Sequence, residues 1–487
     1  MPLLYKDIKF NNGLYEISLN TITRIGQQFI SPNNLEPVGL AQNLKILPEY
    51  LNSLGYESHL LGRWSQGFCS QKYLPTQRGF KSFYGTWTEG GDHLNHLSSA
   101  DPKSALTSLG YDFHEDESIR LGNIGYSTVD LMVDRFEALL YQHFNIEAGF
   151  FSGFPTGKIE LTDDAKPLFT LLSFDNLKVP LQPEERFLEM YPYQQDQQRK
   201  NFLAAVSNLD DAVGKMVANL KRFYRKVGGQ ERSIFEDTVI IFTSLSGGES
   251  GGPLPSGSSN FPHRGGSGDL LEGGTRVPSF ITNINTTGTV TTMFHISDWL
   301  PSIFTGIGGG NENNLTYIDG HNQLDVFRGN SEPLRSEILY DIANFNTTDY
   351  THVTSSQWPD NLVMTGAFGA ALRVGDFKLS VGCSTRLGCA RNYNATWEGN
   401  TSNKRVELYD LARDPQEKND ISEEPDYKAT VEQLFKRIQF HLKRAVTPLH
   451  KEFDSSGLPL YSFPPGQYYT GWCDVEKYEV LKNSTAF

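Results

Sequence analysis

The chain has 487 residues, of which 38% are hydrophobic and 12% aromatic. This composition suits a globular protein and excludes a disordered one, and the length exceeds that of one typical domain. The formal net charge of −14 argues against a general nucleic-acid binder, because such proteins are usually basic. No run of about 18 apolar residues occurs, so we expect no membrane-spanning helix.

The first regular elements alternate between helix and strand. Residues 47–55 predict a helix, because Pro48 suits a first helical turn and Gly55 can end it. Periodicity then predicts a strand at 58–62, a helix at 127–140, a buried strand at 166–174, a helix at 201–223, and strands at 238–244 and 277–282. This alternation predicts an α/β fold, with a mostly parallel sheet sandwiched by helices.

The helix at 201–223 has the clearest pattern. Its apolar residues recur three or four positions apart and would form one face; they are Phe202, Ala205, Val206, Leu209, Val213, Met216, Val217 and Leu220. We expect this face to pack in the core.

Beyond Asn344 the pattern changes to short strands typical of an antiparallel sheet, followed by an amphipathic helix at 431–446. We therefore predict two units: an α/β domain at 1–345 and a small C-terminal α+β subdomain at 346–487. The charged face of the late helix is expected to be solvated while its apolar face docks on the small sheet.

Six N-x-S/T sequons favour a secreted glycoprotein; they lie at Asn285, Asn314, Asn346, Asn394, Asn400 and Asn483. The first twenty residues contain no apolar signal segment, so we expect either that the true N-terminus is missing from this sequence or that export is unconventional.

The chain contains four cysteines, an even number that suits two disulfides with three possible pairings. Cys383 and Cys389 are close enough in sequence for a small local loop, which leaves Cys69 with Cys473. The alternative is four reduced, buried thiols.

The stretch "IIFTSLSGGES" at 240–250 predicts the end of a buried strand and the loop that follows it. Active sites of α/β sheets lie at the carboxyl ends of the strands. This loop should therefore carry reactive side chains, yet it offers Leu245 and Ser246.

Motifs spread along the chain resemble those of the sulfatases, most closely the arylsulfatase B branch with its I and J relatives. In chain order they are "GYESHLLGRW", "YLPTQRGFKSFYG", "LDDAVG", "VIIFTSLSGG", "HRGGSGDLLEGGTRVPSFI", "HISDWLPSI" and "LYDLARDPQEKND". The resemblance extends from about Arg24 to Cys473. It implies an alkaline-phosphatase-like fold, with a large α/β domain followed by a small antiparallel sheet and a packed helix.

The resemblance also implies a chemistry. Members of this family hydrolyse sulfate esters with a hydrated formylglycine, made from the Cys of a C-x-P-S-R motif. A calcium ion held by Asp and Asn oxygens polarises the sulfate. Lys and His side chains neutralise charge and move protons.

At the metal and nucleophile positions this chain departs from the family. Leu245 and Ser246 stand where the family has its Asp-Asn metal ligands. The C-x-P-S-R region falls near residues 9–13, from Lys9 to Gly13, and contains no Cys. The family's N-terminal Asp-Asp pair has no counterpart, so the N-terminal part of the family domain is expected to be missing.

Other catalytic positions are altered as well. Arg63 and Ser65 replace the Lys and His of the G-K-W-H motif, Lys178 replaces the His before P-L-Q, and Ser267 replaces a Lys. Because nucleophile, metal ligands and general acid are lost together, the resemblance implies a pseudoenzyme without cofactors. The alternative is an active calcium-dependent arylsulfatase whose N-terminal segment is absent from this sequence.

Four basic residues could still form an anion pocket for a sulfated glycan: Arg63, Lys178, His263 and Arg264. The alternative is that they pair with nearby carboxylates such as Asp92 or Glu272. Asp92, His93 and His96 resemble a metal cluster by composition, but the resemblance places this segment beside the substrate pocket.

In the related fold the first strand lies inside the central sheet, so its absence would leave neighbouring strands with unpaired backbone groups. Three explanations stay open: a truncated sequence, another segment in the slot, or a strand donated by a partner chain. The last would make the protein a component of an extracellular assembly.

Overall fold

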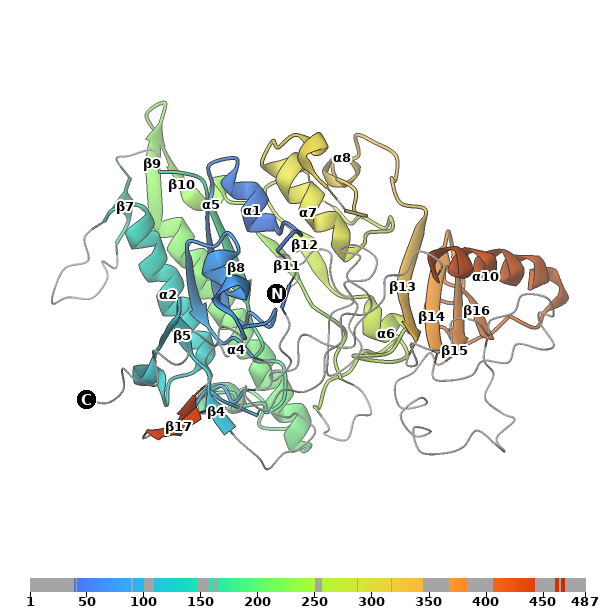
Figure 1. Cartoon of the computed structure of the whole chain (residues 1–487), viewed down its shortest axis with the longest axis horizontal. Helices are drawn as coiled ribbons and strands as arrows, with labels where there is room; N and C mark the ends of the chain where they lie inside the picture. Colours follow the sequence, from blue (N-terminus) through green and yellow to red (C-terminus); the bar gives the residue numbers. More distant parts are fainter. Residues whose placement is uncertain are drawn as a thin grey trace.

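The computed structural model describes residues 39–40, 42–88, 91–99, 109–146, 157–161, 165–249, 256–286, 288–316, 318–344, 368–382, 406–442, 460–463 and 466–468. Within these residues, an α/β unit lies at one end of the long axis and an antiparallel sheet with a helix at the other (Figure 1). No helix within these residues is long and apolar enough to cross a membrane.

A five-stranded sheet forms the centre of the larger unit. Its strands, in spatial order, are β6 (Ser118–Ile119), β5 (His114–Glu115), β2 (Ser82–Gly85), β1 (Glu57–Gly62) and β8 (Leu168–Ser173). β1 pairs in parallel with β2 and β8, whereas β5 and β6 are antiparallel additions. The sheet is therefore mixed, because β5 pairs antiparallel with β2. The two residues between β5 and β6 allow only a hairpin, so β6 is in turn antiparallel to β5.

Two long helices cover one face of this sheet. They are α2 (Thr128–His143) and α4 (Gln197–Arg222), which pack on each other. The carboxylate of Asp196 caps α4 by accepting the backbone N–H groups of Gln198, at 2.9 Å, and Arg199, at 3.1 Å.

The opposite face is covered by shorter helical segments. These are α1 (Leu47–Asn52), α7 (Trp299–Pro301) and the π-helical turn η6 (Ser302–Ile307), which bury a cluster containing Trp299 and Phe304. Proline occupies the first turn of α1, as the sequence predicts.

Two strands form a separate small sheet. β11 (Ile241–Thr243) and β12 (Ser279–Ile281) pair antiparallel with each other. Shorter elements complete the unit: η2 (Gln71–Tyr73), η3 (Pro75–Gln77), η4 (Leu121–Asn123), α3 (Glu185–Leu188), α5 (Ile234–Asp237), α6 (Glu272–Thr275), η5 (Ile296–Asp298), η7 (Glu312–Asn314), α8 (Leu324–Phe327) and the sheet β10 (Gln230–Ser233)–β9 (Phe223–Val227)–β7 (Ile159–Glu160).

The smaller unit is an antiparallel sheet with one helix packed on it (Figure 1). Its elements are β13 (Glu337–Asn344), β14 (Phe368–Val374), β15 (Phe377–Gly382), β16 (Val406–Asp410), η10 (Pro425–Tyr427) and α10 (Lys428–Leu442). Val431, Leu434, Phe435 and Ile438 of α10 join the sheet's apolar core. The expected α/β fold with a small antiparallel sheet and a packed helix is confirmed.

Strand pairing divides the chain differently from the expected boundary at 345. β13 already pairs with β14 of the smaller sheet. β17 (Leu460–Phe463) and β18 (Gly466–Tyr468) return to the larger unit, where β18 pairs with β4 (Leu109–Tyr111), which in turn pairs with β3 (Leu97–Ser99).

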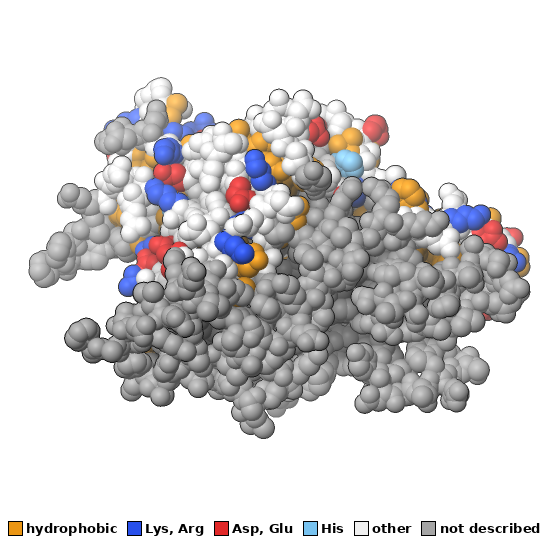
Figure 2. All heavy atoms as spheres, in the orientation of Figure 1, with side chains coloured by type: hydrophobic (Ala, Val, Ile, Leu, Met, Phe, Trp, Pro, Cys, Tyr) orange, Lys and Arg blue, Asp and Glu red, His pale blue; other side chains and the backbone are white. Residues whose placement is uncertain are grey.

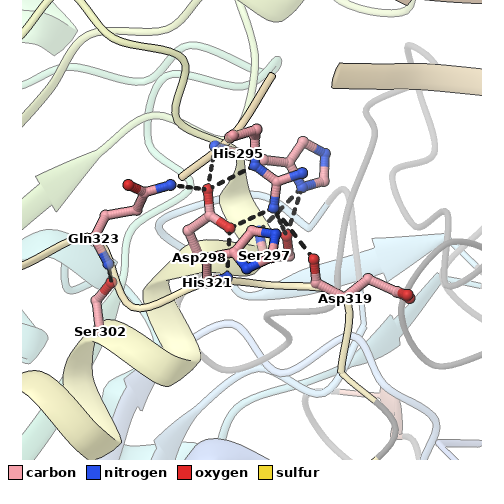
Figure 3. A network of polar contacts seen from close by, with 8 residues as sticks. His295, Ser297, Asp298, Ser302, Asp319, His321 and Gln323 are labelled. Atoms are coloured by element: carbon pink, nitrogen blue, oxygen red, sulfur yellow. Dashed lines mark hydrogen bonds and ion pairs between the residues drawn. The ribbon is translucent and has the colours of Figure 1, made fainter. Parts of the chain in front are cut away.

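A polar network anchors the segment between the two units (Figure 3). The Asp298 side chain is fully buried and accepts hydrogen bonds from the backbone N–H groups of His295 and His321, both at 2.9 Å. Arg335 forms an ion pair with the same carboxylate and donates to the carbonyl oxygen of Asp319 at 3.2 Å. The chain just before β13 is thereby fixed against η5.

A buried ion network joins the two units. The Lys378 ammonium on β15 lies 2.9 Å from Oε1 of Glu272 on α6 and 2.8 Å from Oε1 of Glu417. Tyr340 donates its hydroxyl proton to Glu272 at 2.9 Å. The side chains of Lys378 and Glu417 are 0% exposed, so this charge network is part of the core between the units.

Candidate functional site

The carboxyl ends of β1, β8 and β11 border one cavity of about 1820 Å³. Arg63 follows β1, Asp175 and Lys178 follow β8, and Leu245 and Ser246 follow β11, and all five line it. The structure thus brings together several positions that the sequence analysis singled out separately.

Leu245, where the resemblance led us to expect a metal ligand, makes apolar contacts. Its half-buried side chain packs against an apolar cluster that includes Trp64, Phe83 and Leu171. A cation in contact with this side chain would lose hydration without gaining a ligand.

The Ser246 hydroxyl is already used within its own loop. It donates to the carbonyl oxygen of Gly247 at 2.8 Å and lies 3.4 Å from the hydroxyl of Ser267. Two altered family positions that are 21 residues apart therefore meet, and both present neutral hydroxyl groups.

Gly247, which follows Ser246, and Gly273 are required by close backbone packing. A Cβ on Gly247 would lie 1.7 Å from the carbonyl oxygen of Gly273, and a Cβ on Gly273 would lie 2.4 Å from the carbonyl oxygen of Arg264. The backbone N–H of Gly247 also donates to the carbonyl oxygen of Gly274 at 2.9 Å. The strand-end loop thus keeps its fold independently of any catalytic side chain.

The segment after β1 holds Arg63 beside β8. Gly62 has a φ of 102°, and the backbone N–H of Arg63 donates to the carbonyl oxygen of Ser173 at 3.0 Å. Ser65, at the position of the family's His, is buried with a φ of 51°, and its hydroxyl lies 3.5 Å from the carbonyl oxygen of Thr88. It faces backbone rather than a substrate.

Lys178 is positioned by a turn after β8. Its backbone N–H donates to the carbonyl oxygen of Asp175 at 2.9 Å, and its half-buried side chain lines the cavity. The Asp175 carboxylate lies 3.6 Å from Nδ1 of His93. Asp175 is a site residue that no sequence motif indicated; its place just after a buried strand was the available signal.

His263 and Arg264 lie beside the smaller unit. Nδ1 of His263 is 2.9 Å from the carbonyl oxygen of Pro415, while the Arg264 guanidinium bonds the carbonyl oxygen of Glu417 and the Tyr409 hydroxyl. His263 lines the cavity together with Arg63 and Lys178, whereas Arg264 does not. The four-residue anion pocket stays a prediction, with three of its members on one cavity.

The two carboxylates considered as alternative partners make other contacts. Asp92 accepts the backbone N–H groups of Leu94, Asn95 and Leu97. Glu272 accepts from Tyr340 and Lys378. Burial alone would raise the pKa of Glu272, but the Lys378 charge and hydrogen bond and the Tyr340 hydroxyl outweigh burial and lower it.

The residues at the expected metal position do not fit calcium. This ion needs several oxygen ligands, whereas Leu245 has none and the Ser246 hydroxyl is neutral. No group of three or more His, Cys, Asp or Glu within the described residues is arranged to hold a metal. Asp92, His93 and His96 do not converge, because Nε2 of His96 bonds the carbonyl oxygen of Asn123 and His93 faces Asp175.

Some predicted positions lie outside the described residues; they are Lys9, Gly13, Asn346, Cys383, Cys389, Asn394, Asn400, Cys473 and Asn483. The sequon residues Asn285 and Asn314 are exposed. Cys69 is buried and disulfide-bonded, which rules out the reduced-thiol alternative at this position. Its pairing with Cys473 stays a prediction.

Comparison with known proteins gives consistent results. The Sulfatase family model matches residues 12–308, more than half of the chain. The chain is 28% identical to Arylsulfatase J of Mus musculus over 90% of its own length and 68% of that protein. It is 26% identical to N-acetylgalactosamine-6-sulfatase of Homo sapiens, but spans only 40% of that protein.

Solved structures share the fold at low identity. Ps i-CgsB in complex with k-i-k-neocarrahexaose superposes with a TM-score of 0.63 at 18% identity, covering 95% of this chain and 84% of that one. The PsFucS1 sulfatase from Pseudoalteromonas sp. gives a TM-score of 0.57 at 17% identity, covering 93% and 84%.

Proposed function

The chain belongs to the sulfatase family, and from this premise we propose that it is a secreted arylsulfatase-like glycoprotein without sulfatase activity. One observation carries this proposal: Leu245, at the position that the resemblance assigns to a metal ligand, is half-buried and packs against an apolar cluster. Sulfate-ester hydrolysis on this fold needs a cation and a nucleophile together, and each supplies orders of magnitude in rate. A leucine at the expected cation position opposes binding of the cation, because its side chain has no donor atom.

The role that we propose for the protein is binding of sulfated glycans in an extracellular assembly. Arg63 and Lys178 place two positive charges on the cavity wall near the strand ends, and His263 adds a ring nitrogen. Guanidinium and ammonium groups bind sulfate-like oxyanions through charge-assisted hydrogen bonds. A related fold has been solved with k-i-k-neocarrahexaose, so the fold accommodates an oligosaccharide.

The distribution of surface charge favours glycan binding at the cavity over glycan binding to a broad basic surface. On the face in Figure 2, the visible Lys and Arg side chains are interspersed with Asp and Glu over the described residues. The net charge of −14 also disfavours a general polyanion binder.

The activity half of the proposal is tested with an aryl sulfate substrate and added calcium. We expect no turnover above that of buffer, with or without a chelator. Turnover that the chelator abolishes would support the alternative function, an active calcium-dependent arylsulfatase whose N-terminal segment is absent from this sequence. The similarity to Arylsulfatase J is the observation that favours that alternative.

The binding half is tested by calorimetry with N-acetylgalactosamine 6-sulfate and with unsulfated N-acetylgalactosamine. We expect measurable affinity for the sulfated sugar only. Lys178→Met should weaken this affinity by about 10- to 100-fold, because a charge-assisted hydrogen bond contributes about 1.5–3 kcal/mol. Lys178→Arg should retain most of the affinity. Lys81→Met should leave it unchanged, because the Lys81 ammonium pairs with Glu57 and Lys81 does not line the cavity. Equal affinity for both sugars would refute glycan binding through sulfate.

A further inference from the structure

A smaller cavity, of about 410 Å³, lies at the edge of the central sheet where its parallel strands begin. Glu57 and His59 of β1, Ser82 of β2 and Lys166 just before β8 line it. The larger cavity extends along β8 to Lys166, but the three residues of β1 and β2 line the smaller cavity alone. A volume of this size is within the ~300–1000 Å³ of ordinary small-molecule sites.

Positive charge exceeds negative charge among the described residues that line this amino-end cavity. Lys81, Arg135 and Lys166 are cations, and Glu57 is the one acidic side chain among these lining residues. The Glu57 carboxylate is shared, since it lies 2.7 Å from Nζ of Lys81 and 3.3 Å from Nζ of Lys166. The cavity is therefore locally basic in a protein whose net charge is −14.

Arg135 of α2 has one nitrogen that is not used. Its Nη2 lies 2.7 Å from Oε1 of Glu115, a carboxylate outside the cavity lining that also pairs with Arg120. Its Nε is buried and has no hydrogen-bond partner within the described residues. A buried N–H group without an acceptor is unfavourable. A ligand oxygen in the cavity would supply this acceptor.

His59 presents a second buried nitrogen of this kind. The residue is 4% exposed, its Nδ1 lies 2.7 Å from Oγ of Ser82, and its Nε2 has no hydrogen-bond partner in the part of the chain that is described. Burial, followed by the Lys81 charge, lowers the pKa of His59 to about 4, so the ring is neutral at pH 7. Nε2 then donates in one tautomer and accepts in the other. A ligand that can both accept and donate satisfies it in either tautomer.

We propose that this amino-end cavity binds a phosphate group, as the free ion or as the monoester of a small molecule. At pH 7 a phosphate monoester carries a charge of about −1.5 to −2, which matches the excess of cations. Its oxygens can accept from Nε of Arg135 and from the two ammonium groups, and its remaining proton can be donated to Nε2 of His59. Leu139 and Phe144 add apolar lining for the organic part of an ester.

A sulfate monoester fits this cavity less well than a phosphate monoester. It carries a single negative charge and has no proton to donate to Nε2 of His59. The amino-end cavity is thereby distinguished from the sulfated-glycan site proposed at the carboxyl ends of the strands, and the phosphate proposal does not depend on that site.

The test titrates the full chain carrying Lys178→Met by calorimetry, because this substitution weakens anion binding at the carboxyl-end cavity. The probes are inorganic phosphate, N-acetylgalactosamine 6-phosphate and N-acetylgalactosamine 6-sulfate. We expect both phosphate probes to bind, and the sugar sulfate to bind at least about tenfold more weakly than the sugar phosphate. Tighter binding of the sugar phosphate than of inorganic phosphate would identify a monoester as the ligand, and the reverse would identify the free ion.

Variants of the two buried nitrogens locate the binding site. His59→Leu and Arg135→Met should each weaken phosphate binding by at least about tenfold, because each removes a hydrogen bond to a charged ligand. His59→Gln places an amide near the position of Nε2 and should retain most of the affinity. Arg120→Met is the matched control for Arg135→Met, since Arg120 pairs with the same carboxylate but does not line the cavity, and it should leave the affinity unchanged.

Three outcomes would overturn the proposal. The first is the absence of phosphate binding to the Lys178→Met chain, which would assign all anion binding to the carboxyl-end cavity. The second is equal affinity for the sugar phosphate and the sugar sulfate. The third is an equal loss of affinity in Arg120→Met and Arg135→Met, which would show an effect of overall charge. The comparison of these two arginine variants stays decisive where His59→Leu does not fold.

Discussion

Replacing Lys378 by methionine should weaken the contact between the two units more than any surface substitution. Its ammonium lies 2.9 Å from Glu272 and 2.8 Å from Glu417, and 4.1 Å from the centre of the Tyr340 ring. Lys378→Met keeps an unbranched side chain, one atom shorter, but leaves two buried carboxylates without their shared cation. Removing one partner of a buried ion network costs about 3–5 kcal/mol.

This cost should depend on pH. Burial raises the pKa of Glu417 in the native protein, even though the Lys378 charge opposes the change. A raised folded-state pKa means that Glu417 contributes stability below its unfolded value, and that this contribution is lost as pH rises through the folded value. Without Lys378 both carboxylates should protonate more readily, so the penalty should shrink as pH falls toward about 4.5.

The destabilisation caused by Lys378→Met can be measured locally by hydrogen exchange at the backbone amides of Leu379 and Val381 in β15. A loss of about 3–5 kcal/mol predicts exchange that is about 150- to 5,000-fold faster at pH 7. Arg413→Met is the control, because Arg413 is 80% exposed and its ion pair with Asp410, at 3.6 Å, should contribute little. A triple variant that adds Glu272→Gln and Glu417→Gln should recover much of the loss.

The reasoning would be refuted if Lys378→Met changed exchange no more than Arg413→Met did. It would also be refuted if the triple variant were no more stable than the single one, since the penalty is assigned to uncompensated buried charge.

Three further predictions concern the strand-end loop and the central sheet. Gly247→Ala should lower the free energy of unfolding by about 2–3 kcal/mol in chemical denaturation, because its Cβ would lie 1.7 Å from the Gly273 carbonyl oxygen. Gly122 has open space around it, so Gly122→Ala should leave the stability unchanged. Equal effects of the two substitutions would contradict the packing argument. Leu245→Asp should lower the free energy of unfolding by about 1–3 kcal/mol, because packing is lost and the carboxylate is poorly solvated. Millimolar calcium should not raise the melting temperature of this variant. A calcium-dependent rise would show a usable metal site. Burial, followed by the Lys81 charge, lowers the pKa of His59 from 6.5 to about 4. The free energy of unfolding should therefore fall by up to about 3 kcal/mol as pH drops from 6.5 to 4. His59→Gln should flatten this pH dependence in urea titrations, and an unchanged pH dependence would assign it to other groups.

Sequence periodicity alone determined the type and order of the main elements. The helix predicted at 201–223 is α4, and the strands predicted at 58–62, 166–174, 238–244 and 277–282 are β1, β8, β11 and β12. These segments are specified locally, since the spacing of apolar residues sets which backbone conformation can bury them. The identities at 245 and 246 were enough to question a metal site, because coordination depends on donor atoms that a side chain either has or lacks.

Only the tertiary structure decided what each buried face contacts. The apolar face of α4 looks uniform in sequence, yet Ala205 is in the core while Phe202 and Leu209 line the cavity. The pairing of β18 with β4 joins residues more than 350 positions apart, at Tyr468 and Tyr111, and no local pattern encodes it. The Glu272–Lys378–Glu417 network likewise requires both units to be folded, because a charged side chain is stable in a core only when its partners arrive from elsewhere in the chain.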